Sequence, residues 1–179
     1  MAELKNSILY ISASPRKNSF SGAIAENILS EKSKKNPHIK IIKINTYQLN
    51  ISPCSACNCC KEKGICVIDD DMQHIYNLLK SVDAIVISSP IYFSSLPGTL
   101  KNLIDRCQVF WWRKDVGEKK EAFIVLCSGR SYNGVFDGAL KTLKHFFSVI
   151  NFMYNEKNII CAENTDEKKE DDIINGLKN

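Results

Sequence analysis

Short apolar segments alternate with amphipathic helical segments along most of this 179-residue sequence. Residues 84–87, and most of residues 121–126, carry apolar side chains at successive positions instead of at every second one. A strand with this pattern is buried on both faces, which is typical of a parallel sheet with helices on each side. We therefore predict an α/β fold with a doubly wound parallel sheet, in one domain spanning residues 1–179.

The expected elements follow this alternation. The strands are predicted at residues 7–11, 39–44, 84–87, 121–126 and 158–162. The helices are predicted from about Ser21 to before Pro37, from Asp70 or Asp71 onward, from Leu96 to Val109, from Val135 to Ile150, and as a short helix in the charged tail. The segment at residues 46–70 is too long for an ordinary connection, so we expect it to be a functional loop.

Composition and charge argue against several classes of protein. The net charge is +4, and the lysines are dispersed apart from Lys32, Lys34 and Lys35, so the basic face of a nucleic-acid-binding protein is not expected. No segment approaches the ~18 apolar residues of a membrane span, and the N-terminus lacks the pattern of a signal peptide. We therefore expect a cytoplasmic protein with reduced thiols and no membrane partner.

The cysteines pose the main chemical question, because five of the eight lie within residues 54–66. Four follow the spacing C-x2-C-x2-C-x5-C: Cys54, Cys57, Cys60 and Cys66. Cys59 is an additional thiol inside this run. Compact runs of this kind can supply four thiolates to a [4Fe–4S] cluster, and a zinc ion or free thiols are the alternatives. The remaining three cysteines are isolated in apolar surroundings and are expected to be buried: Cys107, Cys127 and Cys161.

The loop after the first expected strand offers groups that bind anions. It has the sequence SASPRKNSFS at residues 12–21 and leads into a helix N-terminus. Its candidate ligands are four hydroxyls, an amide and a cation: Ser12, Ser14, Ser19, Ser21, Asn18 and Arg16. Backbone N–H groups and the positive helix end add to these, so an anionic group is expected here, and a helix cap with solvated serines is the alternative. The loop matches neither G-x-G-x-x-G nor the Walker sequence, which argues against a Rossmann dinucleotide site and a nucleoside triphosphatase.

Two further loops are expected at the same edge, because the carboxyl ends of parallel strands meet there. Residues 88–106 begin with an apolar and aromatic stretch that is suited to pack against a flat ring system. Residues 127–134 contain Gly129 and Gly134, which permit a ligand to approach the backbone closely.

The three loops and the cysteine segment together resemble the flavodoxin-like NAD(P)H-dependent FMN reductases. The segments that carry the resemblance are SASPRKNS, SPIYFSSLPGTLKNLIDR and PC-x2-C-x2-C-x3-G-x-C-x3-DDM, within about residues 5–135. The cysteine spacing is most similar to that of the iron–sulfur flavoproteins of anaerobes. This resemblance implies a five-stranded sheet in flavodoxin order, FMN at its carboxyl edge, and a homodimer or homotetramer.

The resemblance also assigns roles to individual residues. It implies that the FMN phosphate is held by Ser12, Ser14, Arg16, Asn18, Ser19 and Ser21. It implies that the isoalloxazine ring is bordered by Pro90, Ile91, Tyr92, Phe93 and Ser94, and on its other side by Ser128 and Gly129. It favours Cys54, Cys57, Cys60 and Cys66 as cluster ligands, with Cys59 pointing away or replacing Cys60, and with Gly64 turning the chain back. The sequence departs from the family at Ala13, where glycine is usual, and in the short segment after Ile160.

The leading hypothesis is an FMN-dependent oxidoreductase that takes a hydride from NADH or NADPH. Because the flavin carries the chemistry, no side chain is expected to act as a catalytic acid or base. A cluster, if the cysteines hold one, would receive electrons from FMN one at a time and pass them to an electron acceptor of unknown identity. The alternative is a flavodoxin-like binding protein or thiol redox sensor without a cluster and without turnover.

Two other features receive structural interpretations. Trp111 and Trp112 are expected after a helix and favour a subunit interface. The three histidines are expected to be structural or surface residues: His38, His74 and His145.

Overall fold

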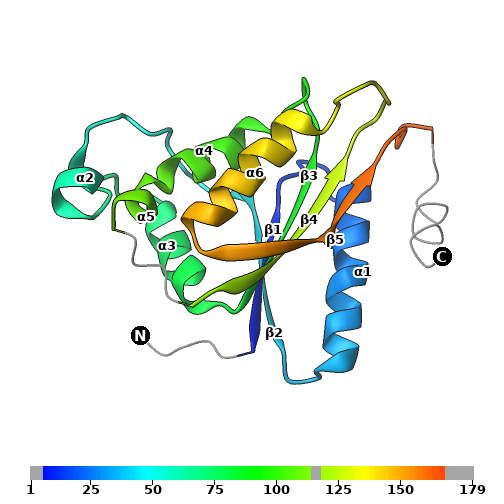
Figure 1. Ribbon diagram of the computed structural model, residues 1–179, viewed down its shortest axis with the longest axis horizontal. Helices are drawn as coiled ribbons and strands as arrows, with labels where there is room; N and C mark the ends of the chain where they lie inside the picture. Colours follow the sequence, from blue (N-terminus) through cyan, green and yellow to red (C-terminus); the bar gives the residue numbers. More distant parts are fainter. Residues whose placement is uncertain (1–5, 114–117, 168–179) are drawn as a thin grey trace.

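The computed structural model describes residues 6–113 and 118–167, which contain a five-stranded sheet in the order β2-β1-β3-β4-β5 (Figure 1). The strands are β1 (Ser7–Ser12), β2 (Lys40–Asn45), β3 (Ala84–Pro90), β4 (Lys120–Cys127) and β5 (Phe152–Ala162). All neighbouring strands pair in parallel. This is the flavodoxin strand order, and it confirms the predicted doubly wound α/β fold.

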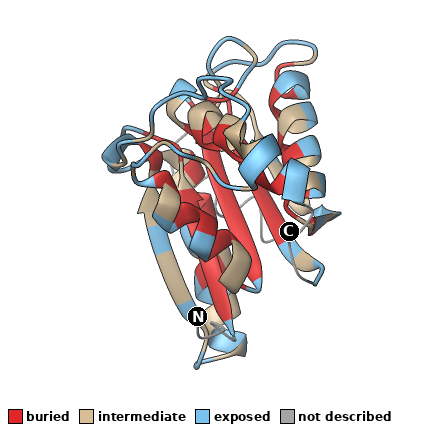
Figure 2. Ribbon diagram, turned by 90° about the vertical axis from the view of Figure 1, so that its left-hand side faces the viewer, coloured by how far each residue is buried: buried red, intermediate tan, exposed pale blue. Residues whose placement is uncertain are grey.

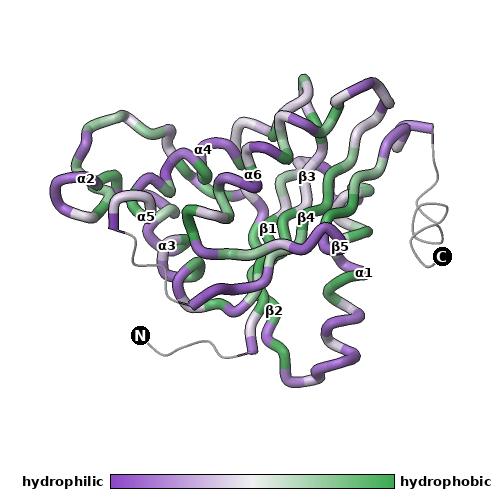
Figure 3. Tube along the Cα trace, in the orientation of Figure 1, coloured by the Kyte–Doolittle hydropathy of each residue, from purple (hydrophilic) through white to green (hydrophobic). Residues whose placement is uncertain are grey.

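The central strands are buried because both of their faces carry apolar side chains. All residues from Ser7 to Ile11 in β1 and from Ala84 to Ser89 in β3 are buried, whereas β2 at the sheet edge is partly exposed. Figure 2 shows the buried residues concentrated in the central strands and on the inner faces of the helices. Figure 3 shows that apolar residues follow these strands along the chain.

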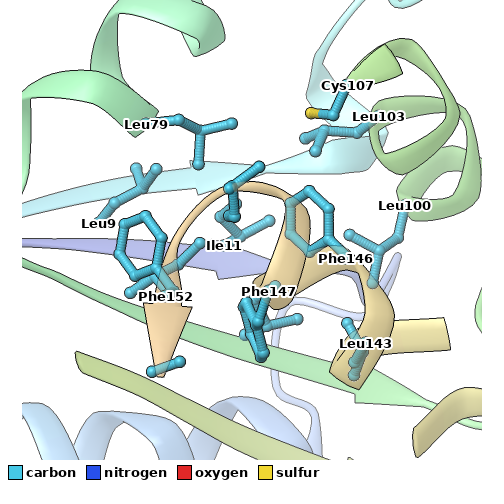
Figure 4. Close-up of a cluster of buried hydrophobic side chains, with 14 of the residues drawn as sticks. Leu9, Ile11, Leu79, Leu100, Leu103, Cys107, Leu143, Phe146, Phe147 and Phe152 are labelled. Atoms are coloured by element: carbon cyan, nitrogen blue, oxygen red, sulfur yellow. The ribbon is translucent and has the colours of Figure 1, made fainter. Parts of the chain in front are cut away.

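Helices cover both faces of the sheet. On one face, α1 (Phe20–Lys35) packs on a core that includes Ile8 and Tyr10. The other face is covered by α3 (Met72–Ser81), α4 (Gly98–Arg106), α5 (Gln108–Arg113) and α6 (Asp137–Val149). Figure 4 shows part of this larger core, in which Leu9 and Ile11 of β1 lie among side chains from these helices.

The segment between β2 and α3 contains two short helical turns that the sequence pattern did not predict. They are η1 (Thr46–Gln48) and α2 (Cys59–Lys63), and α2 packs against α5 at one end of the molecule (Figure 1). The helix predicted after this segment is present as α3, with Asp71 as its N-cap residue.

Two predicted elements differ from the structure. The helix predicted at residues 96–109 is divided, because the N–H of Cys107 bonds to the carbonyl of Ile104, three residues earlier, at 3.0 Å and ends α4. Trp111 and Trp112 therefore lie inside α5, not after a helix. The last strand begins at Phe152 instead of residue 158, since a register shift opposite residues 122–124 lets β5 pair with both ends of β4.

Two remaining predictions concern the tail and membranes. Most of the tail helix predicted from the sequence falls in residues 168–179, outside the described residues. Within residues 6–113 and 118–167, no helix has both the length and the apolar character that crossing a membrane requires.

Candidate functional site

The loop between β1 and α1 forms a polar cavity at the carboxyl end of β1. The cavity has a volume of about 720 Å³, and four predicted anion-binding residues line it: Ser12, Arg16, Asn18 and Ser19. Lys17 adds a second cation, and Asn45 lines the cavity from the end of β2. Asn45 is not apparent as a member of this site from the sequence, because it lies on a different strand. Glu26 also lines the cavity, and its carboxylate is paired with Lys43 at 2.7 Å. The hydroxyl, amide and cationic groups suit an anionic group such as a phosphate.

Other serines of this loop stabilise its shape. Ser14 and Ser21 are 2% and 1% exposed and do not line the cavity. The Ser14 hydroxyl accepts a hydrogen bond from the N–H of Arg16 at 3.2 Å, and the carbonyl of Ser14 accepts one from the Asn45 amide at 3.0 Å. Ser19 caps α1 by accepting from the N–H of Gly22 at 3.2 Å. The loop is thus held in place by its own side chains and by β2.

Ala13, at the position where glycine is usual in the family that the sequence resembles, does not intrude on the cavity. Its side chain is fully buried in the larger core, and its N–H donates to the carbonyl of Ser88 at 2.8 Å. The methyl group therefore points into the protein interior and leaves the cavity open.

The loop after β3 contains a tight turn that presents an aromatic side chain to solvent. Phe93 and Ser94 have φ values of +50° and +58°. Tyr92 and Ser95 close the turn through two backbone hydrogen bonds of 3.0 Å each. Two consecutive positive φ values without glycine cost free energy, and such strain is concentrated at functional sites. The Phe93 side chain is fully exposed at this edge of the sheet.

The loops after β3 and β4 adjoin, as the parallel sheet predicted. The N–H of Ile91 donates to the carbonyl of Cys127 at 2.8 Å, and the hydroxyls of Ser94 and Tyr132 lie 3.0 Å apart. The carbonyl of Ser94 also approaches Gly138 so closely that a Cβ there would lie 2.6 Å from this oxygen. Pro90 and Ile91 are half-buried, so Tyr92 and Phe93 form the exposed tip of the loop.

Ser128 and Gly129 lie at the same edge but are covered by the chain after β5. Ser128 is buried, and its hydroxyl donates to the carbonyl of Arg130 at 2.7 Å. Thr165 donates to the carbonyl of Ser128 at 3.1 Å, and a Cβ at Gly129 would overlap the carboxylate of Asp166. The sequence analysis did not anticipate this cover, because nothing in the local sequence links residues 128 and 165.

The four cysteines of the C-x2-C-x2-C-x5-C run line one cavity of about 450 Å³: Cys54, Cys57, Cys60 and Cys66. Cys59 does not line it. The far wall comes from the end of α4 and from α5, including Arg106 and Trp112. Folding therefore gathers the same four thiols that the spacing selected.

The backbone around these cysteines has several left-handed residues. Ala56, Asn58 and Gly64 have φ values of +53°, +61° and +68°. Asn58 and Gly64 bound α2, and the N–H of Gly64 bonds to the carbonyl of Cys60 at 3.1 Å. Gly64 therefore turns the chain back toward Cys66, as predicted, and this turn brings the fourth thiol to the cavity.

Cys59 acts on a neighbouring thiol from outside the cavity. Hydrogen bonds from the backbone and side chain of Cys59 lower the pKa of Cys57, and the same interaction raises the pKa of Cys59. Burial raises the pKa of Cys60. Cys57 is thus the thiol whose surroundings favour the thiolate form.

A buried ion pair closes the base of the cysteine segment. Arg106 donates to the two carboxylate oxygens of Asp70 at 2.7 and 3.1 Å, and their side chains are 1% and 3% exposed. Arg106 also donates to the carbonyl of Ser52 at 2.9 Å, while the N–H of Ser52 donates to Asp70 at 3.0 Å. This pair ties both ends of the segment to α4. A signal was present in the sequence, because Arg106 follows Leu100 and Leu103 at a helical spacing that puts a charge on the apolar face.

The four thiols of this cavity are candidate ligands for a metal centre. Within residues 6–113 and 118–167, no three His, Cys, Asp or Glu side chains converge closely enough to hold a single ion. Zinc needs four ligands converging at about 2.0–2.3 Å, whereas a cluster of four irons is held at its corners by thiolates spread around it. Thiolates bind both kinds of centre, and these four cysteines line one cavity of about 450 Å³.

The tryptophans, the histidines and the three isolated cysteines remain to be placed. Trp111 lies over a groove beside α6, with its ring centroid 5.8 Å from that of His145, whereas Trp112 lines the cysteine cavity. His38, His74 and His145 are exposed, as expected. Among the isolated cysteines, Cys107 and Cys127 are buried as predicted, but Cys161 is exposed because β5 is an edge strand.

Comparison with known proteins identifies the family. Residues 6–165 match the family described as NADPH-dependent FMN reductase. The chain belongs to this family. An iron-sulfur flavoprotein of Methanosarcina thermophila is 35% identical over 115 residues, and one of Methanocaldococcus jannaschii is 30% identical over 146 residues. These matches cover 64% and 79% of this chain, but 56% and 72% of the two relatives.

Two solved structures share the fold of this family member. An azoreductase of Bacillus anthracis superposes with a TM-score of 0.71 at 14% identity, over 97% of this chain and 95% of its own. An NAD(P)H:quinone oxidoreductase of Methanothermobacter marburgensis gives a TM-score of 0.65 at 14% identity, over 99% and 93%. At this identity, the likeness concerns the arrangement of the flavodoxin-like sheet and helices.

Proposed function

We propose that this FMN reductase family member is an FMN-binding, NAD(P)H-dependent oxidoreductase of the iron–sulfur flavoprotein type. Bound FMN would accept a hydride from the nicotinamide, and a [4Fe–4S] cluster would relay its electrons singly to an acceptor protein or small molecule. The single observation that carries the cluster part is the gathering of Cys54, Cys57, Cys60 and Cys66 around one cavity that excludes Cys59.

The chain's own residues supply binding and orientation in this proposal. Arg16, Asn18 and Ser19 hold the phosphate at the cavity beside the N-terminus of α1, where the N–H groups of the helix favour an anion. The turn at Phe93 and Ser94 presents backbone and aromatic surface to the ring system. Ser14 and Ser21 support the loop from inside instead of touching the phosphate.

α4 connects the two proposed centres. Its N-terminus follows the turn at Phe93, and its C-terminal residue, Arg106, lines the cysteine cavity. Eight steps of helix from Gly98 to Arg106 span about 12 Å at 1.5 Å per residue. The cysteines thus lie at the far end of α4 from the proposed flavin edge.

The first test is purification without oxygen, followed by absorption spectroscopy and assays of flavin, iron and acid-labile sulfide. We expect one FMN and a brown cluster absorbance that dithionite bleaches. Mixing with NADH and NADPH in turn should bleach the flavin and identify the preferred nicotinamide. A colourless protein that takes up no added FMN contradicts the proposal. A flavin that stays oxidised with both nicotinamides favours the thiol-sensor alternative.

Matched cysteine variants test the ligand set. Cys66→Ser should lose iron and sulfide, whereas Cys59→Ser should retain both, because Cys66 lines the cavity and Cys59 does not. Unchanged iron content in Cys66→Ser would overturn the ligation by these four thiols. We also propose that the protein is cytoplasmic and forms a homo-oligomer. Sedimentation of the purified protein measures its oligomeric state.

A further inference from the structure

Arg106, which lines the cysteine cavity, has one buried polar side-chain atom without a partner. Among the described residues that are not exposed, the Nε of Arg106 is the buried side-chain nitrogen or oxygen for which no hydrogen bond is present. The terminal nitrogens of the same guanidinium are fully engaged with Asp70 and with the carbonyls of Ser52 and Ile68. An unpaired buried N–H costs about 1–3 kcal/mol, so its retention points to a ligand that accepts its hydrogen bond.

The position of Arg106 shows where such a ligand would lie. Arg106 lines the same cavity as the four cysteines and is 2% exposed. Burial lowers its pKa, but hydrogen bonding to the Asp70 and Cys66 side chains outweighs burial and raises it. The Cys66 sulfur is therefore the acceptor that lies beside the guanidinium, although no atom meets the full geometry of a hydrogen bond with Nε.

The guanidinium cannot turn away from the cavity to find another partner. Its two terminal nitrogens are held by the Asp70 carboxylate. That carboxylate in turn accepts hydrogen bonds from the N–H groups of Ser52 and Met72 at 3.0 and 3.1 Å. The carbonyl of Arg106 is held by the hydroxyl of Tyr76 at 2.8 Å. The Nε–H is thus preorganised, and its direction is set by contacts that exist without any ligand.

We propose that Arg106 is a positioning residue for the redox centre, whose Nε–H donates to a sulfur of the iron–sulfur cluster or to its Cys66 thiolate ligand. This inference rests on the proposed function and adds a polar tuning group to it. Reduction adds negative charge to the cluster and its sulfurs, and a cationic donor stabilises that charge. Arg106 therefore raises the reduction potential of the cluster, in addition to holding the cysteine segment in place.

Arg106→Lys is the sharpest variant, because lysine keeps the charge opposite Asp70 but has a methylene where arginine has Nε–H. Arg113→Lys is the matched control: Arg113 also contacts the cysteine segment, donating to the carbonyl of Gly64 at 3.2 Å, but it is exposed. Both proteins are purified without oxygen, and their iron, sulfide and far-ultraviolet circular dichroism are compared with the parent. The cluster midpoint potential is then measured by redox titration followed by electron paramagnetic resonance.

We expect Arg106→Lys to keep its cluster and to lower the reduced-to-oxidised ratio at a fixed potential about tenfold, equivalent to ~59 mV for a one-electron couple. Arg113→Lys should leave the potential unchanged. An unchanged potential and unchanged spectrum in a folded, iron-loaded Arg106→Lys protein overturns the inference while leaving the proposed function intact.

A measurement on the unaltered chain covers the case in which Arg106→Lys does not fold. Protein labelled with ¹⁵N-arginine is reduced, and pulsed electron paramagnetic resonance is used to detect a coupled ¹⁵N nucleus. Coupling supports the inference, and its absence overturns it. A chain that binds FMN but takes up no iron overturns both this inference and the cluster part of the proposed function, which the iron assay separates from a failure of Arg106 alone.

Discussion

Arg106 and Asp70 are separated by 36 residues in the chain, yet they form a buried, two-point ion pair between the C-terminus of α4 and the end of the cysteine segment. Breaking one partner of such a pair leaves an uncompensated buried charge. The geometry of the cysteine cavity therefore depends on this pair, which ties the cysteine segment to α4.

Asp70→Asn should destabilise the protein by about 3–5 kcal/mol, because it leaves the buried Arg106 cation without its counter-ion. The measurement is urea unfolding followed by circular dichroism. Asp105→Asn is the matched control, since Asp105 pairs with Lys101 on the surface, where both side chains are 45% exposed. We expect the control to cost no more than about 1 kcal/mol. Equal losses in the two variants would contradict this assignment.

The same pair gives a pH dependence. Burial alone raises the pKa of Asp70, but hydrogen bonds from Arg106 and from backbone N–H groups outweigh burial and lower that pKa below its ordinary value. The stabilisation is therefore complete above the unfolded-state pKa of about 3.9 and is lost as the pH falls through the lower folded-state pKa. The free energy of unfolding should decrease with acidification in this window, and Asp70→Asn should show a smaller decrease.

Arg16→Ala should weaken FMN binding about 10- to 100-fold, which corresponds to the loss of a charged hydrogen bond of about 1.5–3 kcal/mol. Riboflavin lacks the phosphate, so its affinity should not change. Quenching of flavin fluorescence measures both affinities on the flavin-free protein. Parallel losses for FMN and riboflavin would show that Arg16 does not contact the phosphate.

Phe93→Ala should leave the free energy of unfolding within about 0.5 kcal/mol, because this side chain is fully exposed. It should nevertheless weaken the binding of both FMN and riboflavin, since the proposed contact is with the ring. Trp111→Ala removes another exposed aromatic side chain, from the groove beside α6, and serves as the control. Unchanged flavin affinity in Phe93→Ala would place the ring elsewhere.

Thiol reactivity should separate the cysteines of the reduced, metal-free protein. We expect iodoacetamide at pH 7 to modify Cys57 before Cys107 and Cys127, as measured by peptide mass spectrometry over time. Cys57 is exposed and its pKa is lowered, whereas burial raises the pKa of Cys107 and raises that of Cys127 to about 12. Cys59→Ala should slow the reaction of Cys57, because it removes one of the hydrogen bonds that favour its thiolate. If Cys107 or Cys127 were modified as fast as Cys57, these differences in thiol reactivity would be refuted.

The sequence was most informative where one local pattern has one physical cause. Continuous apolar strands predicted a buried parallel sheet, and the spacing of Cys54, Cys57, Cys60 and Cys66 selected the four thiols that line one cavity. Boundaries were harder, because the division of a predicted helix at Cys107 and the early start of β5 depend on hydrogen bonds with other segments.

The anion-binding loop shows the same limit at the level of single residues. Its composition identified the loop, but six polar side chains of similar chemistry could not be divided into ligands and supports from their order in the chain. Packing makes that division, since it buries Ser14 and Ser21 and leaves Ser12, Arg16, Asn18 and Ser19 on the cavity.

The sequence by itself thus determined the fold class, the family resemblance and the chemical types of the groups at each loop, because periodicity and spacing are local properties. Only the tertiary structure decided that Arg106 lines the cysteine cavity, that Asp166 covers Gly129, and that α4 runs from the loop after β3 to the cysteine cavity. These relationships join residues far apart in the chain, and a local pattern can mark a residue for burial but cannot name its distant partner.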